Sequence, residues 1–239
     1  MAFNHGSSYY ESSYPAVNTT DLGLYIDAGK KDSYSGTGTT WSDLSGNGYD
    51  FSLVNGASFS EEGGGSILVD GSNEYMQYTS YPTASNWTAF LTFRQDGSGT
   101  YDFRGHRTFF ATPQLRFQWD DNSTLSARGP FVDTVGLGSV SGTTFTPSEF
   151  QNIWQTAAIS SGTSGTVIYY NGSQTGTGGM NIVLHSTVRI GLDGVSGIGG
   201  ADGLGSEDGC KIGVFLIYNR VLSSTEILQV HNRLSYRFR

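Results

Sequence analysis

The chain has 239 residues, with 34 Gly, 5 Pro, 13% aromatic and 14% charged residues. This composition is typical of many short strands joined by tight turns, and it excludes a mainly helical or a disordered protein. The formal net charge is -8 and the 13 Lys and Arg residues are scattered along the sequence, which excludes the basic stripe of a nucleic-acid-binding protein. We therefore expect a single all-β domain with no nucleic-acid partner.

Residues 1–20 form the first expected segment, and 21–239 follow as one domain. The segment is rich in Ser and Asn and has no regular period. One interpretation is a flexible tail. The other is a docking arm, because aromatic side chains supply contact area when an extended segment lies on a partner. The docking candidates are Phe3, Tyr9, Tyr10 and Tyr14.

The same segment has neither a basic start nor a long apolar run, and no part of the chain is apolar for the length of a bilayer span. We therefore expect no export by the general secretory route and no membrane insertion. Cys210 is the single cysteine, so no internal disulfide can form. It is expected to be a small buried residue rather than a nucleophile.

Alternating apolar and polar residues, separated by turn signals, predict about ten strands after the segment 1–20. No helical segment separates them, so we expect antiparallel pairing. The expected strands are 22–26, 67–69, 75–78, 87–93, 108–111, 115–119, 153–159, 166–170, 182–190 and 211–218.

Two local patterns add detail to these strands. Residues 41–48 predict a polar turn, with Trp41 and Leu44 as apolar anchors before it. The dipeptide at 171–172 is Asn-Gly, which predicts a tight hairpin between 166–170 and 173–177.

The end of the chain predicts a strand followed at once by a helix. A continuous apolar run covers 214–217. Ser223 then lies three residues before Glu226, which is the spacing of a capping box. The helix is expected to bury one face, made of Ile227, Val230 and Leu234.

Several motifs in this order resemble the laminin-G-like, concanavalin A-like lectin/glucanase domains. The resemblance covers about residues 21–239, and it implies a jelly-roll sandwich of two antiparallel sheets with a short C-terminal helix. The motifs that carry it are 22–29, 41–47, 65–76, Trp154, 168–172 and 217–227.

The resemblance leaves function open, because the same sandwich carries lectins, adhesion modules, glycosidases and virion proteins. Glycosidases of this type resemble one another in carrying acidic residues at alternate positions of one strand, and no such run is present. The neighbouring acids of 61–62 and 207–208 are interpreted as solvated loop charges. The four histidines show no metal-ligand spacing. We therefore expect a protein that is not an enzyme.

Two acidic, Gly-rich loops are candidate calcium sites, because Ca²⁺ takes carboxylate, amide and carbonyl oxygens. No cofactor is expected to be required. Relatives in the superfamily hold calcium at a sheet rim, but Gly213 stands where an acidic residue often occurs, which argues against an inherited site. The candidate ligands are Asp70, Asn73 and Glu74 in one loop and Asp193, Asp202, Glu207 and Asp208 in the other.

A candidate carbohydrate patch lies in the middle of the sequence, where rings could stack on a sugar and polar groups could hold its hydroxyls. The alternative is core packing for Trp119 and ordinary exposure for the others. The patch consists of Tyr101, Arg104, His106, Trp119, Asp120 and Asp121.

Laminin-G-like modules work mostly outside cells, whereas this sequence carries no export signal and no cysteine pair. A bacteriophage virion protein satisfies both conditions, because it is made in host cytoplasm and released by lysis. The first hypothesis is therefore a non-enzymatic virion protein of the capsid-decoration or head-fibre type. Residues 1–20 would attach it to the major capsid protein or to tail proteins, and the sandwich would contact host surface glycans, with a homo-oligomer on the particle as one arrangement.

The alternatives are a tail-associated receptor-binding adhesin, a glycoside hydrolase on the same fold, and a bacterial lectin exported by an unusual route. Capsid decoration is favoured over a long tail fibre, because fibre shafts need heptads or repeating β segments and the sequence has neither.

Overall fold

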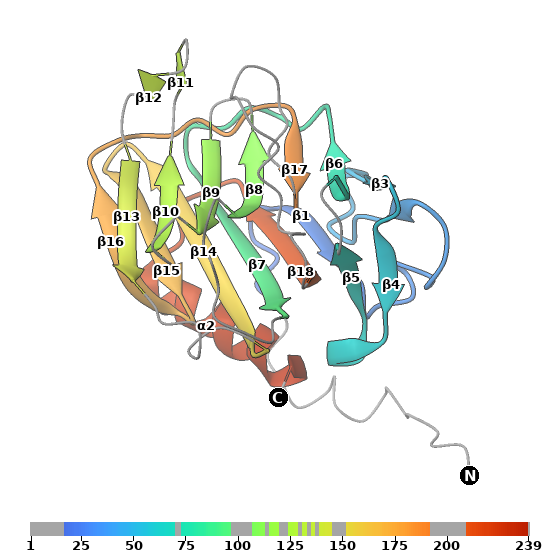
Figure 1. The fold of residues 1–239 in the computed structure, drawn as a ribbon. Helices are drawn as coiled ribbons and strands as arrows, with labels where there is room; N and C mark the ends of the chain where they lie inside the picture. Colours follow the sequence, from blue (N-terminus) through green and yellow to red (C-terminus); the bar gives the residue numbers. More distant parts are fainter. Residues whose placement is uncertain are drawn as a thin grey trace.

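Two antiparallel β-sheets packed face to face form the protein, with one short helix at the C-terminal end (Figure 1). The computed structural model describes residues 17–69, 73–96, 107–112, 115–119, 124–128, 131–132, 135–136, 139–144, 152–191 and 209–238. This arrangement is the all-β jelly-roll sandwich that the sequence predicts.

The first sheet contains eight strands, and its central strand is β18. One edge of β18 pairs with β7, and the other edge pairs with β5 and then with β1. Its strands, in spatial order, are β16 (Ser173–Gly178), β15 (Gly165–Tyr170), β14 (Trp154–Gly162), β7 (Trp87–Gln95), β18 (Cys210–Tyr218), β5 (Ser66–Val69) and β4 (Ser58–Ser60), with β1 (Leu22–Asp27) beside β18.

The second sheet also contains eight strands, and a separate two-stranded ribbon is formed by β11 (Phe131–Val132) and β12 (Val135–Gly136). The strands of the second sheet are β13 (Ser139–Thr144), β10 (Thr124–Arg128), β9 (Leu115–Trp119), β8 (Arg107–Thr112), β17 (Val188–Ile190), β6 (Tyr75–Tyr78), β3 (Phe51–Val54) and β2 (Thr40–Trp41).

The space between the sheets is filled by large apolar side chains. Trp41 and Trp87 are both fully buried there, and the indole Nε1 of Trp87 donates to the carbonyl of Ile182 at 2.8 Å. Cys210 is buried in the same core, which confirms its expected packing role. The hydrogen bond matters because an unpaired indole N–H in this core would oppose folding.

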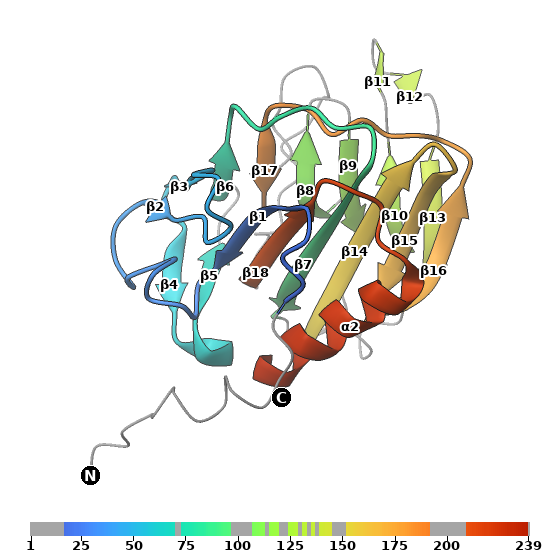
Figure 2. The ribbon, with the colours of Figure 1, turned by 180° about the vertical axis from the view of Figure 1, so that it is seen from behind.

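Helix α2 (Ser224–Ser235) covers the outer face of the first sheet (Figure 2). The Ser223 hydroxyl accepts from the Glu226 amide, and the Glu226 carboxylate accepts from the Ser223 amide, so the predicted capping box is present. Its buried face consists of Ile227, Val230 and Leu234, as predicted. Among the described residues, no helix has both the length and the apolar character to cross a membrane.

The polar turn at 41–48 is organised by the carboxylate of Asp43. This group accepts hydrogen bonds from the backbone amides of Tyr25, Ser45 and Tyr49 at 2.8–3.1 Å. The Asn47 amide also donates to the Gly23 carbonyl at 2.9 Å. The turn therefore fastens the segment that follows β2 onto β1, and Trp41 is buried in the core at the end of β2.

The structure contains more strands than the alternation of apolar and polar residues predicts. Every predicted strand coincides with an observed one, but the range 182–190 contains only the short strand β17 and an isolated bridge at Leu184. The prediction omits the following strands of the two main sheets: β2, β3, β4, β10 and β13. They are short, or they carry mainly polar residues as β13 does, so alternation is weak within them.

Candidate functional site

Residues that are paired across neighbouring strands of the second sheet form rows, and each row lies on one face of the sheet. One row joins residues of seven neighbouring strands, and its members Leu53, Met76 and Ile190 are buried in the core. All its members are apolar: Leu53, Met76, Ile190, Phe110, Phe117, Ala127 and Val140. This row belongs to the inner face of the sheet.

The adjacent row belongs to the outer face, because successive residues of a strand alternate between the two faces. We call it the arginine row. Its described side chains are exposed in β2 and β3 and partly exposed in β6 and β17. Its members, in spatial order, are Thr40, Ser52, Gln77, Arg189, Ala111, Arg116, Arg128 and Ser139.

Arg189 is held in place by two neighbours on β6. Its guanidinium carbon lies 4.7 Å from the centre of the Tyr75 ring, and its Nε donates to the Gln77 side-chain oxygen at 3.1 Å. Within the described part of the chain it forms no ion pair, whereas Arg94, Arg220 and Arg237 each pair with a carboxylate. The ring contact and the hydrogen bond together orient its guanidinium group.

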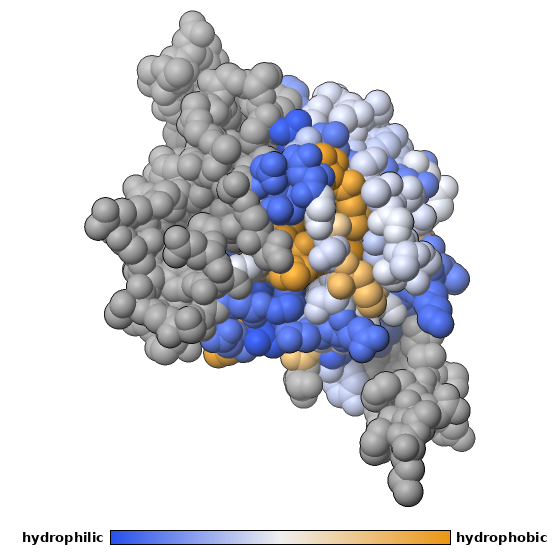
Figure 3. All heavy atoms as spheres, turned by 45° about the vertical axis from the view of Figure 1, so that its right-hand side comes forward, coloured by the Kyte–Doolittle hydropathy of each residue, from blue (hydrophilic) through white to orange (hydrophobic). Residues whose placement is uncertain are grey.

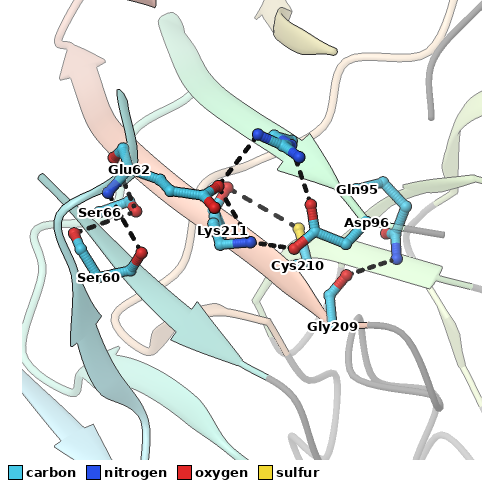
Figure 4. Close-up of polar contacts among 9 residues, drawn as sticks. Ser60, Glu62, Ser66, Gln95, Asp96, Gly209, Cys210 and Lys211 are labelled. Carbon is cyan, nitrogen blue, oxygen red and sulfur yellow. Dashed lines mark hydrogen bonds and ion pairs between the residues drawn. The ribbon is translucent and has the colours of Figure 1, made fainter. Parts of the chain in front are cut away.

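A second polar cluster lies on the outer face of the first sheet, where four charged residues from three chain segments meet (Figure 4). Arg94 contacts Glu62 at 3.0 Å and Asp96 at 2.9 Å. Lys211 contacts Glu62 at 3.2 Å and also pairs with Asp96. Each carboxylate thus faces two cations, so this cluster joins strands β7 and β18 to the turn η1 (Glu62–Gly64).

The ion pairs also bear on whether this cluster could act as a glycosidase site. A retaining glycosidase needs one free carboxylate as nucleophile and one protonated carboxyl as acid. Glu62 and Asp96 each lie within ion-pair distance of both Arg94 and Lys211, so neither carboxylate is free for these roles. Glu62 was predicted to be a solvated loop charge, whereas it forms ion pairs with Arg94 and Lys211, with its side chain 48% exposed.

Apolar surface is limited among the described residues. Figure 3 shows a narrow apolar stripe within a largely hydrophilic surface on the side of the molecule that carries β4 and β6. The large apolar side chains that are substantially exposed in the described part are Ile153, Val221 and Leu228, which come from different elements. The described part of the surface therefore carries no broad patch of large exposed apolar side chains.

Most of the candidate residues from the sequence lie outside the described residues. Trp119 is the last residue of β9, where its backbone pairs with Arg107 and Leu125. The docking candidates Phe3, Tyr9, Tyr10 and Tyr14, and the sugar candidates Tyr101, Arg104, His106, Asp120 and Asp121, are not described. The arm and the carbohydrate patch therefore stay predictions.

The calcium candidates are described only in part. Asn73 is exposed, and its backbone carbonyl accepts from the Asn55 side chain at 2.9 Å. The Oε2 atom of Glu74 is buried and accepts no hydrogen bond from the described residues. No group of three or more His, Cys, Asp or Glu residues is found in this part of the chain. Asp70, Asp193, Asp202, Glu207 and Asp208 lie outside it, so both calcium sites stay predictions.

The inherited calcium site near Gly213 has a steric obstacle. A Cβ atom at Gly213 would lie 2.4 Å from the ring of Phe238, which belongs to the C-terminal turn η2 (Tyr236–Phe238). An acidic side chain at this position is therefore incompatible with the present packing of the C-terminus.

Comparison with known proteins identifies relatives through structure only. No family model matches the chain, and no curated protein matches its sequence. The receptor-binding domain of botulinum neurotoxin type G is similar, with a TM-score of 0.67 and 15% identity over 89% of this chain and 51% of the other. The binding domain of Paraclostridial mosquitocidal protein 1 is similar, with a TM-score of 0.66 and 16% identity over 90% and 52%.

A third similar structure is the binding domain of botulinum neurotoxin DC in complex with SialylT, with a TM-score of 0.66 and 15% identity over 91% of this chain and 52% of the other. This chain therefore spans about half the length of the structures that it matches. At this level of identity the likeness shows that the chain shares their β-sandwich fold.

The arginine row was not predicted from the sequence. A local signal existed, because Arg116 and Arg189 each stand between apolar neighbours in a strand, which marks an outward position. The missing information was the strand order that brings them together. The cationic residues are scattered in the sequence, but three of them share one row of the sheet.

Proposed function

We propose that this chain is a non-enzymatic, lectin-like domain that binds a saccharide on the outer face of its second sheet. The observation that carries the proposal is Arg189, which Tyr75 and Gln77 hold in a fixed orientation on this face. Saccharide sites require hydrogen-bonding side chains fixed on a rigid support. The similar toxin domains are receptor-binding by their names, which supports a binding role by analogy of fold.

The pairing of Glu62, Asp96 and Asp27 with cations supports a role other than catalysis for these three carboxylates. Glu62 and Asp96 are neutralised by Arg94 and Lys211. Asp27 pairs with Arg237 in a largely buried position. These groups hold segments of the fold together, and no observation among the described residues favours the glycoside hydrolase alternative.

The binding proposal is tested with the purified full-length chain on an array of neutral and acidic saccharides. We expect concentration-dependent binding to a subset of them and no release of reducing ends during prolonged incubation. Absence of binding to every saccharide class would overturn the proposal, and release of new reducing ends would replace it with the hydrolase alternative.

We further propose that the domain is displayed on a bacteriophage particle, in the capsid-decoration or head-fibre manner, and is attached through its N-terminal arm. The fold is held together by packing, because its single cysteine is buried and makes no disulfide. Such a protein can fold in the reducing cytoplasm where virions assemble. A tail-associated adhesin is the alternative location, and calcium remains a proposed rather than a required ligand.

The display proposal is tested by the composition of purified particles and by a truncation that removes residues 1–16. The truncation keeps Val17, because this residue packs against the apolar cluster under α2. We expect the shortened chain to keep its melting temperature and to be lost from particles. Normal incorporation of the shortened chain would contradict attachment through the arm, and detection in tail fractions alone would favour the adhesin alternative.

A further inference from the structure

Three Asn-Gly dipeptides occur in the sequence, and all three lie among the described residues. A glycine after an asparagine leaves the asparagine side chain open to attack by the next backbone nitrogen, because glycine has no side chain that blocks the approach. In each pair one or both residues adopt a positive φ angle, as in a tight turn. The pairs are Asn47 with Gly48, Asn55 with Gly56, and Asn171 with Gly172.

The first pair is held by several hydrogen bonds from Asn47. Its Nδ2 atom donates to the Gly23 carbonyl at 2.9 Å and to the Ser45 hydroxyl at 3.0 Å. Its backbone amide also donates to the Ser45 hydroxyl, at 3.3 Å. The Asn47 side chain therefore cannot rotate toward Gly48 unless several contacts break together.

The third pair is held by strand β14 and by helix α2. The Thr156 amide donates to Oδ1 of Asn171 at 3.0 Å, and the Asn171 amide donates to the Thr156 carbonyl at 2.9 Å. Gly172 has little free space, because a Cβ atom there would lie 3.0 Å from the His231 ring and from Leu228. Both residues of this pair are thus fixed by the fold.

The second pair forms the turn that leads the chain from β3 in the second sheet to β4 in the first (Figure 1). Asn55 and Gly56 are both exposed, and a Cβ atom at Gly56 would meet nothing within 4 Å. The hydrogen bond from the Ala57 amide to the Val54 carbonyl, which closes the turn, is long at 3.4 Å. Within the described part of the chain, the Asn55 side chain makes a single hydrogen bond, from Nδ2 to the Asn73 carbonyl at 2.9 Å. Opening of this turn therefore breaks fewer contacts than opening of the other two.

We propose that Asn55 is a site of spontaneous deamidation in the folded protein, and that the fold directs this modification to Asn55 rather than to Asn47 or Asn171. The Gly56 nitrogen attacks the side-chain carbonyl carbon of Asn55, so that a C–N bond forms and the bond from Cγ to Nδ2 breaks. The proton of the Gly56 amide leaves with Nδ2 as ammonia. Water then opens the resulting succinimide, which leaves aspartate or isoaspartate at position 55.

The product disrupts the contact with Asn73. A carboxylate cannot donate a hydrogen bond, so an oxygen would face the Asn73 carbonyl where Nδ2 now donates. Isoaspartate also adds a methylene group to the main chain between β3 and β4. Val54 pairs with Tyr75 in β6, so the change loosens the strand that orients Arg189. The modification is independent of the proposed saccharide-binding function, whereas its effect on binding rests on that function.

The site is tested by incubation of the full-length chain at neutral pH in heavy-oxygen water, once folded and once unfolded in urea. Mass spectrometry of the digested chain then measures each pair separately, since the label marks only residues that reacted during the incubation. In urea we expect the three rates to agree within about threefold, because local sequence alone acts there. In the folded chain we expect Asn55 to react about tenfold or more faster than Asn47 and Asn171, which serve as controls within the same molecule.

Two variants separate the reaction from its consequence. Asn55→Gly accepts the positive φ angle of 57° and has no amide to lose, so it should abolish labelling at this position and leave the other two rates unchanged. Asn55→Asp introduces the product charge directly. In this variant, and in the deamidated fraction isolated by ion exchange, we expect amide hydrogen exchange at 73–78 to be about tenfold faster than in the fresh chain. Exchange in the β14–β15 hairpin should be unchanged.

Three outcomes would overturn the proposal. Equal rates at the three pairs in the folded chain would show that the fold does not select among them. Faster reaction at Asn47 or Asn171 would show that hydrogen bonds to the side chain promote the reaction. Protection of Asn55 for as long as the unfolded chain takes to react completely would show that its turn does not open.

The consequence for β6 has its own contrary result. Unchanged hydrogen exchange at 73–78 after deamidation would remove the link between Asn55 and the strand that orients Arg189. If the link holds, the deamidated fraction should bind saccharides more weakly than the fresh chain. Failure of the fresh chain to bind any saccharide would remove the proposed function and leave the deamidation result standing.

Discussion

Arg237, in the last turn of the chain, donates a hydrogen bond to the carboxylate of Asp27 at the end of β1, 210 positions earlier. The same guanidinium donates to the backbone carbonyls of Gly63, at 2.9 Å, and of Gly65. Tyr25 also donates to Asp27 at 3.2 Å. The C-terminus is thereby fixed to the end of the first strand and to the turn η1.

Replacement of Arg237 by Ala should lower the free energy of unfolding by about 3 kcal/mol, because Asp27 would remain buried without its cation. Asp27 is only 5% exposed, so water cannot replace the lost partner fully. Urea denaturation measures the change. Lys31→Ala, a control that removes an exposed cation, should change stability by less than about 0.5 kcal/mol. Equal effects of the two variants would contradict a specific role for the Asp27 pair.

Replacement of Trp41 by Ala should cost roughly 3 to 5 kcal/mol, because the ring is fully buried and its removal leaves a cavity in the core. Thermal and urea unfolding both measure this loss. Ile153→Ala is a suitable control, since that side chain is 48% exposed and its removal should be nearly neutral. A neutral Trp41→Ala variant would show that the turn is not anchored through this ring.

Glu226 should make stability depend on pH below about pH 4.5. The hydrogen bond from Arg220, followed by that from the Ser223 backbone, lowers the pKa of Glu226 to about 2 from an ordinary value of 4.5. The unfolded chain therefore binds a proton at Glu226 more readily than the folded protein does. The stabilisation that ionised Glu226 contributes is fully present above pH 4.5 and is lost as pH falls toward 2. Urea midpoints measured from pH 2 to pH 6 test this, and Glu226→Gln should have a flatter profile. Parallel profiles would show that the group does not contribute.

Gly213→Ala should destabilise the protein by about 1–3 kcal/mol, because the new methyl group would overlap the Phe238 ring. Gly179→Ala is the matched control, since a Cβ atom at Gly179 meets nothing within 4 Å. Differential scanning calorimetry compares the two. A Gly213 variant as stable as the control would mean that the C-terminal turn can move away without cost, and would reopen this position to an acidic residue.

The architecture was predictable from local signals. The hairpin after β15 is marked by Asn171 and Gly172, which adopt positive φ angles of 47° and 79° as a tight primed turn requires. The capped helix is marked by Ser223 and Glu226. Such signals depend on neighbours in sequence, so they can be read without the fold. Strand β13 lacks them, because its residues are polar or small and it lies at the edge of the sheet.

The candidate site was not predictable in the same way. The partners of Arg189 and Arg116 are set by the spatial order of β9, β8 and β17, in which β17 comes from a distant part of the chain. Alternation identifies the face on which a residue lies, but it does not identify the strand beside it. The arginine row therefore follows from long-range pairing, whereas the mid-chain carbohydrate patch was inferred from residue types and remains untested.

The position of β18 determines when the protein can fold during synthesis. This strand, Cys210–Tyr218, lies in the centre of the first sheet and pairs with β1, β5 and β7, all of which leave the ribosome much earlier. A nascent chain that stops before residue 210 has the outer parts of the sheet without their centre. Folding of this sheet must therefore wait until residues 210–218 have been synthesised, and the dominance of distant contacts makes it slow relative to helical proteins.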